Sequence, residues 1–200
     1  DHVAWDIGAL DVAKRMARIL NAPLVAAPAS RLLIDPNRDF DAHDLIPETA
    51  EGVPVPGNLR LTDAERAERI AAYHAPFHAG IETVLRAQPD IQALVSIHSF
   101  TPELLGEKRP WHVGVLYDSD TRMADEIYAY LRRDPALVVG RNKPYAPTQG
   151  VFYSMDRHAK GRAVVMIEVR NDLIGHAAGQ ERWSQILAGA TAAALKGLAA

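Results

Sequence analysis

A histidine stands near the end of a short apolar run in the middle of the chain. The segment reads Ala93-Leu94-Val95-Ser96-Ile97-His98-Ser99-Phe100. A β-branched run of this kind is typical of a buried strand, and α/β sheets carry their chemistry at the carboxyl ends of their strands. An imidazole at that position can bind a metal ion or transfer a proton. The alternative is a structural histidine held by hydrogen bonds.

A carboxylate ends a second apolar run. Glu168 follows Ala163-Val164-Val165-Met166-Ile167, the strongest core-strand pattern in the chain. Burying a carboxylate is costly unless it is paired, bound to a metal or exposed in a cleft. Burial is expected to raise its pKa toward that of a general base. Arg170 lies two residues further and on the same strand face, so it either serves the site as a substrate-binding group or forms a structural ion pair with Glu168.

Two arginines and an asparagine flank a turn near the N-terminus. Arg31 precedes Ile34-Asp35-Pro36, and Asn37 and Arg38 follow it. A guanidinium binds both oxygens of a carboxylate, so this group suits the recognition of a substrate carboxylate. The alternative is surface salt bridging with the aspartates Asp35, Asp39 and Asp41.

Other candidates have weaker support from spacing. His74 and His78 are four residues apart on a predicted helix and could face one metal ion. No acidic residue lies between them as in a zincin motif, so packing or surface roles are favoured. Tyr145 could reach a ligand from an irregular stretch, although no spacing rule singles it out.

The elements that must position these residues alternate along the chain. Hydrophobic periodicity and a Thr62-Asp63-Ala64-Glu65 capping box predict helices at 6–20, 62–87 with a kink at Pro76, 121–132 and 179–198. Strands are predicted at 24–27, 91–97, 112–116, 137–139 and 163–167, with long irregular stretches at 35–60 and 142–157. This alternation predicts an α/β fold, a mostly parallel sheet with helices on both faces. Without an internal repeat or linker, one domain over residues 1–200 is expected.

Composition narrows the classes of partner. The chain has a net charge of -3 and no cysteine, so nucleic acid is an improbable partner and any metal must be held by His, Asp or Glu. No segment reaches the roughly 20 apolar residues of a membrane span. We expect a cytoplasmic protein that acts on a small molecule; the oligomeric state is not readable from the sequence.

A set of short motifs resembles the N-formylglutamate amidohydrolase family. The matching segments, in family order, are Trp5-Asp6-Ile7-Gly8, Ser30-Arg31-Leu32-Leu33-Ile34-Asp35-Pro36-Asn37-Arg38, Asp44-Leu45-Ile46-Pro47, Pro56-Gly57-Asn58, Ser96-Ile97-His98-Ser99-Phe100, Arg109-Pro110-Trp111-His112-Val113-Gly114-Val115 and Ile167-Glu168-Val169-Arg170-Asn171-Asp172-Leu173. Each is short, but together they extend over nearly the whole chain.

The resemblance implies a fold and a chemistry. The family is related to zinc carboxypeptidases and aspartoacylase-like enzymes, which implies a central mixed sheet and a zinc site. His98 resembles the last histidine ligand of the zinc, Glu168 the carboxylate that activates water, and Arg31 the arginine that polarises the scissile carbonyl. Asn37 and Arg38 resemble the pair that holds the substrate carboxylate. The implied reaction is zinc-dependent hydrolysis of N-formyl-L-glutamate, or a similar N-acyl amino acid, to formate and glutamate, as in histidine degradation.

Two points stay open at this stage. Asp6 either orients a ligand or helps to bind the metal. The family begins with a strand and a His-containing segment, and no such segment stands before Asp1, so further zinc ligands are expected upstream of Asp1. The alternatives are an amidohydrolase or carboxypeptidase-like enzyme with another N-acyl substrate, and a metal-free carboxylate-binding protein on a decayed hydrolase scaffold.

Overall fold

The computed structural model describes residues 2–147 and 150–198, which form two compact units. The first unit is Asp1–Trp5 with Val25–Pro89, and the second is Asp6–Leu24 with Asp90–Ala200. The single domain expected over residues 1–200 stays a prediction. In the described ranges no helix combines the length and the apolar character that crossing a membrane requires.

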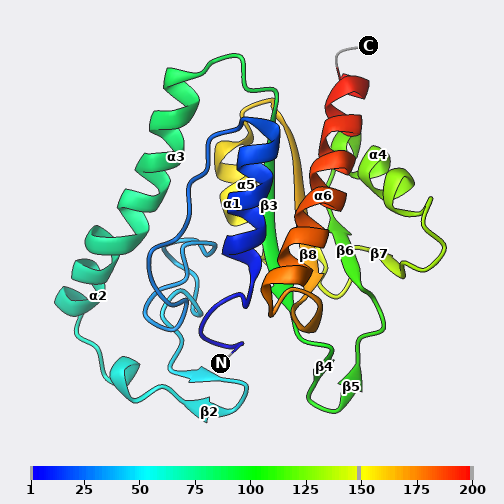
Figure 1. Cartoon of the computed structure of the whole chain (residues 1–200). Coiled ribbons are helices and arrows are strands. Elements are labelled where there is room, and N and C mark those ends of the chain that lie inside the picture. Colours follow the sequence, from blue (N-terminus) through cyan, green and yellow to red (C-terminus); the bar gives the residue numbers. More distant parts are fainter. Residues whose placement is uncertain (1, 148–149, 199–200) are drawn as a thin grey trace. The chain divides into compact units, whose positions relative to one another are not determined.

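The second unit is built on a four-stranded mixed sheet (Figure 1). Its order is β3 (Ala93–Phe100), β8 (Ala163–Arg170), β6 (Val113–Leu116) and β7 (Val139–Arg141). β3 pairs with β8 in parallel and β6 with β7 in parallel, whereas β6 and β8 are antiparallel. The expected α/β fold with a mixed, mostly parallel sheet is therefore confirmed.

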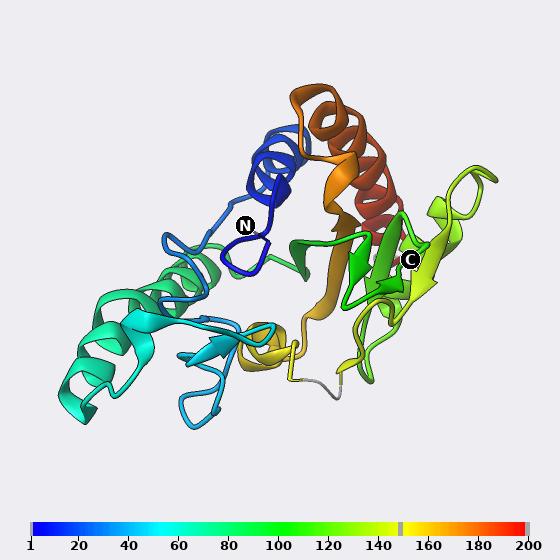
Figure 2. The same ribbon diagram turned by 90° about the horizontal axis from the view of Figure 1, so that it is seen from below.

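One face of this sheet carries the main hydrophobic core. Alternate residues of the central strands point to this face, among them Val113, Val115, Val165, Ile167 and Val169. They pack against apolar stripes of α1 (Ala9–Leu20), α4 (Arg122–Leu131) and α6 (Ala177–Leu198). In Figure 2 the blue α1 and the red-brown α6 lie on the same side of the strands.

The opposite face of the sheet has a smaller core and more polar residues. Met166 and Leu116 pack there against Phe152 and Met155, which belong to or adjoin α5 (Tyr153–Ala159). The yellow α5 lies across the strands from α1 and α6 in Figure 2. The sheet thus has helices on both faces, as the alternation of strand and helix patterns predicted.

Two glycines make room on this second face for an irregular segment. Gly114 on β6 is paired with Gly140 on β7. A Cβ atom on Gly114 would lie 1.8 Å from the carbonyl oxygen of Lys143, and one on Gly140 would lie 2.9 Å from Cδ1 of Trp111. Both glycines therefore allow Trp111 and the chain at Lys143 to pack directly on the strands.

The first unit is irregular around one long helical arm. Asp63–Arg69 (α2), a π-helical turn at Ile70–His74 and Ala75–Ala87 (α3) follow one another without a break. The expected capping box is present, because Thr62 accepts from the Glu65 amide and the Glu65 carboxylate accepts from the Thr62 amide. The irregularity expected at Pro76 takes the form of the π-helical turn, since proline cannot donate the normal helical hydrogen bond.

Short elements complete both units. The first unit has a hairpin of two short strands, β1 (Thr49–Ala50) and β2 (Val53–Pro54), and a 3-10 turn at Pro56–Asn58. The second has a hairpin of β4 (Glu103–Leu104) with β5 (Glu107–Lys108).

Several boundaries differ from those expected. The strand predicted at 24–27 is wrong, because this run has no regular structure; prolines on both sides, Pro23 and Pro28, cannot donate to a sheet. α5 lies inside a stretch predicted to be irregular. β3 and β8 extend past His98 and Glu168, so both residues lie within strands rather than after them.

Gly114→Ala should lower the free energy of unfolding by about 3 kcal/mol, because the new methyl group overlaps backbone that cannot rotate away. Chemical denaturation measures the change. Gly57→Ala is the matched control, since nothing lies within 4 Å of a Cβ atom there. Equal stability of the two variants would contradict the close packing over Gly114.

Candidate functional site

His98 and Glu168 are direct neighbours across two parallel strands. They are register partners on β3 and β8, so their side chains leave the same face of the sheet near the carboxyl ends of both strands. Glu168 is only 5% exposed. Asp6, two residues before the Gly8 cap of α1, places Oδ2 2.7 Å from Nδ1 of His98. The structure therefore brings together Asp6, His98 and Glu168, three of the residues predicted from the sequence.

The Asp6 contact fixes the chemical form of His98. A carboxylate only accepts hydrogen bonds, so Nδ1 of His98 carries the proton and donates it to Asp6. In the neutral imidazole the lone pair then resides on Nε2. A carboxylate behind a histidine is the usual support of a metal-binding or proton-accepting imidazole. In this geometry Asp6 orients His98, which favours the first of the two roles considered for it.

A single row of residues across the sheet defines the environment of Glu168. Its members are His98, Glu168, Gly114 and Gly140, each the register partner of the next. The first two carry reactive side chains, and the other two have none. The chain at Lys143 occupies the space above the glycines, so it packs on the sheet immediately beside Glu168.

Arg170 shares the face of Glu168 but has a different ionic partner. Its guanidinium donates two hydrogen bonds to Asp172, from Nε at 2.8 Å and from Nη2 at 3.2 Å. Arg170 therefore forms its ion pair with Asp172 and not with Glu168, which was the alternative considered. A substrate-binding role for Arg170 stays a prediction.

Tyr145 lies two residues after Lys143 and packs against the smaller core on the Glu168 face. Its hydroxyl accepts a hydrogen bond from Nη1 of Arg109 at 3.2 Å. No sequence pattern singles out Arg109, although it begins one of the family-like motifs. Only the packing of the chain brings it beside Tyr145.

His112 has a structural role. Its Nδ1 accepts a hydrogen bond from the amide of Val138 at 2.9 Å. Burial, followed by the nearby Arg170, lowers the pKa of His112 below its usual value. The ring is thus held neutral as part of the connection between β6 and the segment that leads into β7.

A metal site needs several ligating side chains close together. Within residues 2–147 and 150–198 there is no group of three or more His, Asp or Glu side chains that could hold a metal ion. A catalytic zinc ordinarily has three protein ligands. The described residues therefore supply His98 as one suitable donor and do not complete a site.

Arg31, Asn37 and Arg38 all belong to the other compact unit. The Asn37 amide donates to Oδ1 of Asp35 at 2.9 Å, a local turn that fixes the backbone at this point. The Nε of Arg38 donates to Oδ2 of Asp44 at 2.7 Å. Arg38 therefore forms an ion pair with Asp44, which is not one of the three aspartates named as the alternative, and this pair orients the guanidinium.

Two buried histidines fasten this segment to the helical arm. The Nε2 of His74 donates to the carbonyl oxygen of Arg38 at 2.9 Å, and the Nε2 of His78 donates to that of Pro36 at 3.0 Å. The rings are 0% and 2% exposed, and their centroids are 4.5 Å apart. Each Nε2 donates to a backbone carbonyl on one side or the other of Asn37, so the pair holds this segment.

A further buried polar residue, Asn58, holds the irregular chain on both sides of this segment. The Asn58 amide nitrogen donates to the carbonyl oxygens of Leu32 and Pro47, each at 2.7 Å. Arg69 donates to Oδ1 of Asn58 at 2.7 Å and to the Leu33 carbonyl at 3.0 Å. These side chains replace the sheet or helix hydrogen bonds that an irregular segment lacks.

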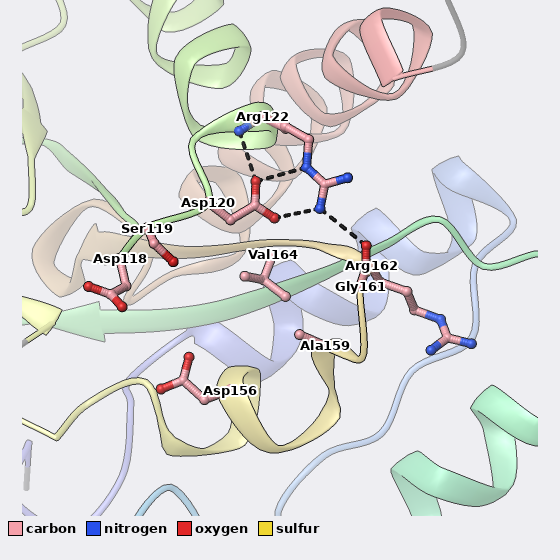
Figure 3. Close-up of a pocket in the computed structure, with 9 residues that line it drawn as sticks. All are labelled: Asp118, Ser119, Asp120, Arg122, Asp156, Ala159, Gly161, Arg162 and Val164. Carbon is pink, nitrogen blue, oxygen red and sulfur yellow. Dashed lines mark hydrogen bonds and ion pairs between the residues drawn. The ribbon is translucent and has the colours of Figure 1, made fainter.

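A separate hollow in the second unit lies at the far end of β8 from Glu168 (Figure 3). It has a volume of about 390 Å³ and is lined near the start of β8 by Gly161, Arg162 and Val164. Burial, together with Asp118, raises the pKa of Asp156 there. The charged lining of this hollow consists of Asp118, Asp120 and Asp156 with Arg122 and Arg162, and Arg122 is paired with Asp120.

Comparison with known proteins gives a consistent picture. A family model described as N-formylglutamate amidohydrolase matches residues 1–175. The crystal structure of the gene product Atu2144 from Agrobacterium tumefaciens is similar at a TM-score of 0.95 and 36% identity, over 100% of this chain and 81% of that one. The crystal structure of N-formylglutamate amidohydrolase from Ralstonia eutropha JMP134 shares the fold at a TM-score of 0.69 and 21% identity, over 92% and 79% of the two chains. No curated protein matches.

His78→Leu should loosen the segment around Asn37, because it leaves the Pro36 carbonyl without its donor in a buried place. Hydrogen exchange of the Asn37 and Arg38 amides should quicken at least about tenfold. His78→Gln is the matched control, since its amide nitrogen can donate from nearly the same position. Unchanged exchange in His78→Leu would show that the contact does not hold the segment.

Proposed function

The chain belongs to the N-formylglutamate amidohydrolase family, and from this premise we propose that it hydrolyses the amide bond of N-formyl-L-glutamate or a similar N-acyl amino acid. The products are the free amino acid and, for the formyl substrate, formate. The proposal includes action on a small molecule in the cytoplasm, as a step of amino-acid breakdown such as that of histidine.

One observation carries the proposal, the Asp6–His98–Glu168 arrangement at the ends of β3 and β8. A buried carboxylate lies beside an imidazole whose ring nitrogen is fixed by a second carboxylate. Glu168 is held within a strand and cannot move far, which suits a group that must transfer a proton in a fixed geometry.

Glu168 acts as the general base and then as the general acid. It takes a proton from water as the water oxygen attacks the formyl carbon, and it returns that proton to the amide nitrogen as the carbon–nitrogen bond breaks. A water molecule is consumed, and the base regains its starting form. Asp6 keeps His98 in one tautomer throughout.

His98 fits one position of the implied zinc site, by the chemistry of its donor atom. With the proton on Nδ1, Nε2 is the nitrogen that would bind the metal, and Asp6 is its supporting carboxylate. Zinc, when bound, supplies acidification of water and stabilisation of negative charge on the scissile oxygen. The zinc site of this proposal needs ligands in addition to His98, because the described residues contain no group of three that could hold a metal ion.

The residues of the first unit keep the roles that the family resemblance gives them. Asn37 and Arg38 bind a substrate carboxylate, and Arg31 polarises the scissile carbonyl. Support for the first role comes from the fixed backbone at Asn37 and from Asp44, which orients Arg38. In the second unit Arg170 and Tyr145 complete the substrate contacts of the proposal.

Glu168→Gln should lose turnover by about 10³-fold while binding substrate nearly normally, because the amide cannot take up the proton. Formate release over a panel of N-acyl amino acids measures turnover, and calorimetry measures binding. Glu126→Gln, an exposed change on α4, is the control. Normal turnover in Glu168→Gln would remove Glu168 from this role. Wild-type protein that binds glutamate without hydrolysing any of the panel would instead be a carboxylate-binding protein.

His98→Ala should lose bound zinc, and Asp6→Ala should weaken zinc affinity by about 10- to 100-fold through the loss of the supporting carboxylate. Elemental analysis and competition with a chelator measure the two effects. The exposed His43→Ala is the control. An unchanged zinc stoichiometry in His98→Ala would exclude His98 as a ligand.

A further inference from the structure

The connector between β8 and α6, residues 171–176, lies against the start of α1 (Figure 2). It follows directly on the strand that carries Glu168. A Cβ atom on Gly8 would lie 2.8 Å from the carbonyl carbon of Ile174, and the φ of Gly8 is +78°, a conformation that other residues rarely adopt. The Ile174 side chain is fully buried in the main core. The connector and the start of α1 are therefore in direct backbone contact.

This contact lies two residues from Asp6. The carbonyl oxygen of Asp6 accepts a hydrogen bond from the Ala9 amide at 3.2 Å, so the backbone from Asp6 to Gly8 belongs to the first turn of α1. The Asp6 carboxylate accepts a hydrogen bond from Nδ1 of His98. The place where the first turn of α1 rests on Ile174 therefore sets the position from which this carboxylate reaches the imidazole.

Gln180, in the first turn of α6, holds the Ile174 carbonyl group. Its side-chain amide donates to the Ile174 oxygen at 3.1 Å. The start of α6 is itself fixed, because the Gly179 amide donates to Nδ1 of His176 at 3.1 Å. A Cβ atom on Gly179 would lie 3.0 Å from the carbonyl carbon of Leu173, so α6 also packs directly on the connector. One side-chain hydrogen bond thus joins α6 to the carbonyl group against which α1 begins.

We infer that Gln180 is a positioning residue for the His98 imidazole. It holds the Ile174 carbonyl, on which Gly8 and therefore Asp6 are placed. Asp6 in turn keeps the proton of His98 on Nδ1 and its lone pair on Nε2. The consequence for hydrolysis rests on the proposed function, whereas the tautomer of His98 can be measured without any turnover.

The geometry leaves little room for a shift of Asp6. Its Oδ2 lies 2.7 Å from Nδ1 of His98, and a displacement of roughly 1 Å would take the two atoms out of hydrogen-bond range. Without the donor from Gln180, the Ile174 carbonyl turns toward another donor, because an unsatisfied acceptor is costly. That turn moves the backbone on which Gly8 rests. Once Asp6 has moved, the neutral imidazole is no longer confined to one tautomer.

Gln180→Met keeps the length of the side chain but cannot donate, so at least about a fifth of the His98 rings should then carry the proton on Nε2. Nitrogen-15 NMR of the histidine rings, at a pH where they are neutral, measures the two tautomers. Gln180→Asn, whose amide is one carbon too short, should give the same result. Gln180→Lys retains a donor on a flexible chain and should restore the proton to Nδ1. Gln185→Met is the matched control, since Gln185 is exposed on α6 and bonds to Glu181.

A second control separates positioning from a general loss of stability. Leu187→Ala removes a fully buried side chain further along α6, so it should lower the unfolding temperature more than Gln180→Met does and leave the proton of His98 on Nδ1. A single tautomer in Gln180→Met, or an equal mixture in Leu187→Ala, would overturn the inference.

The effect on turnover is measured separately. Gln180→Met should lower kcat for N-acyl amino acids by about tenfold with KM nearly unchanged, because a misplaced catalytic group slows the chemical step. A rise in KM with normal kcat would contradict the positioning role. If the wild-type protein hydrolyses none of these substrates, the proposed function fails, and the tautomer of His98 in Gln180→Met still decides this inference.

Discussion

The parallel pairing of β3 with β8 is the constraint on which the site depends. Each strand by itself delivers one reactive residue near its carboxyl end, and only their register makes His98 and Glu168 neighbours. A shift of one residue would turn one of the two side chains to the face of the sheet that α1, α4 and α6 cover. That face is filled by apolar residues of α1, α4 and α6, so the burial of the core and the geometry of the site select the same register.

The two halves of the sheet serve this arrangement differently. β3 and β8 carry the reactive side chains of His98 and Glu168. On β6 and β7, Gly114 and Gly140 have no side chain and allow the chain at Lys143 to approach the strands. A larger residue at either glycine would push this segment away from Glu168. The absence of side chains on one half is therefore as necessary to the surroundings of Glu168 as the reactive side chains on the other half.

The sequence predicts the parts of the molecule that repeat a simple pattern. Strand and helix periodicity was sufficient for the α/β class and the approximate position of His98 and Glu168, and a short local motif was sufficient for the capping box at Thr62. It failed at 24–27, where a short apolar run has no sheet partner, and at α5, whose formation accompanies the packing of Phe152 and Met155 on the sheet. The contact of Asp6 with His98 spans 92 positions, a separation over which no local pattern carries information.

The buried histidines show why residue type alone could not distinguish a ligand from a support. His74 and His78 have the spacing of a metal-binding pair, and each donates from Nε2 to backbone on either side of Asn37. His98 has no histidine partner on its strand, and a carboxylate fixes its Nδ1 and places the lone pair on Nε2. In each case the acceptor that one ring nitrogen finds decides the tautomer of the imidazole. That acceptor comes from a distant part of the chain and is set by tertiary structure, so the spacing of histidines along a helix does not reveal it.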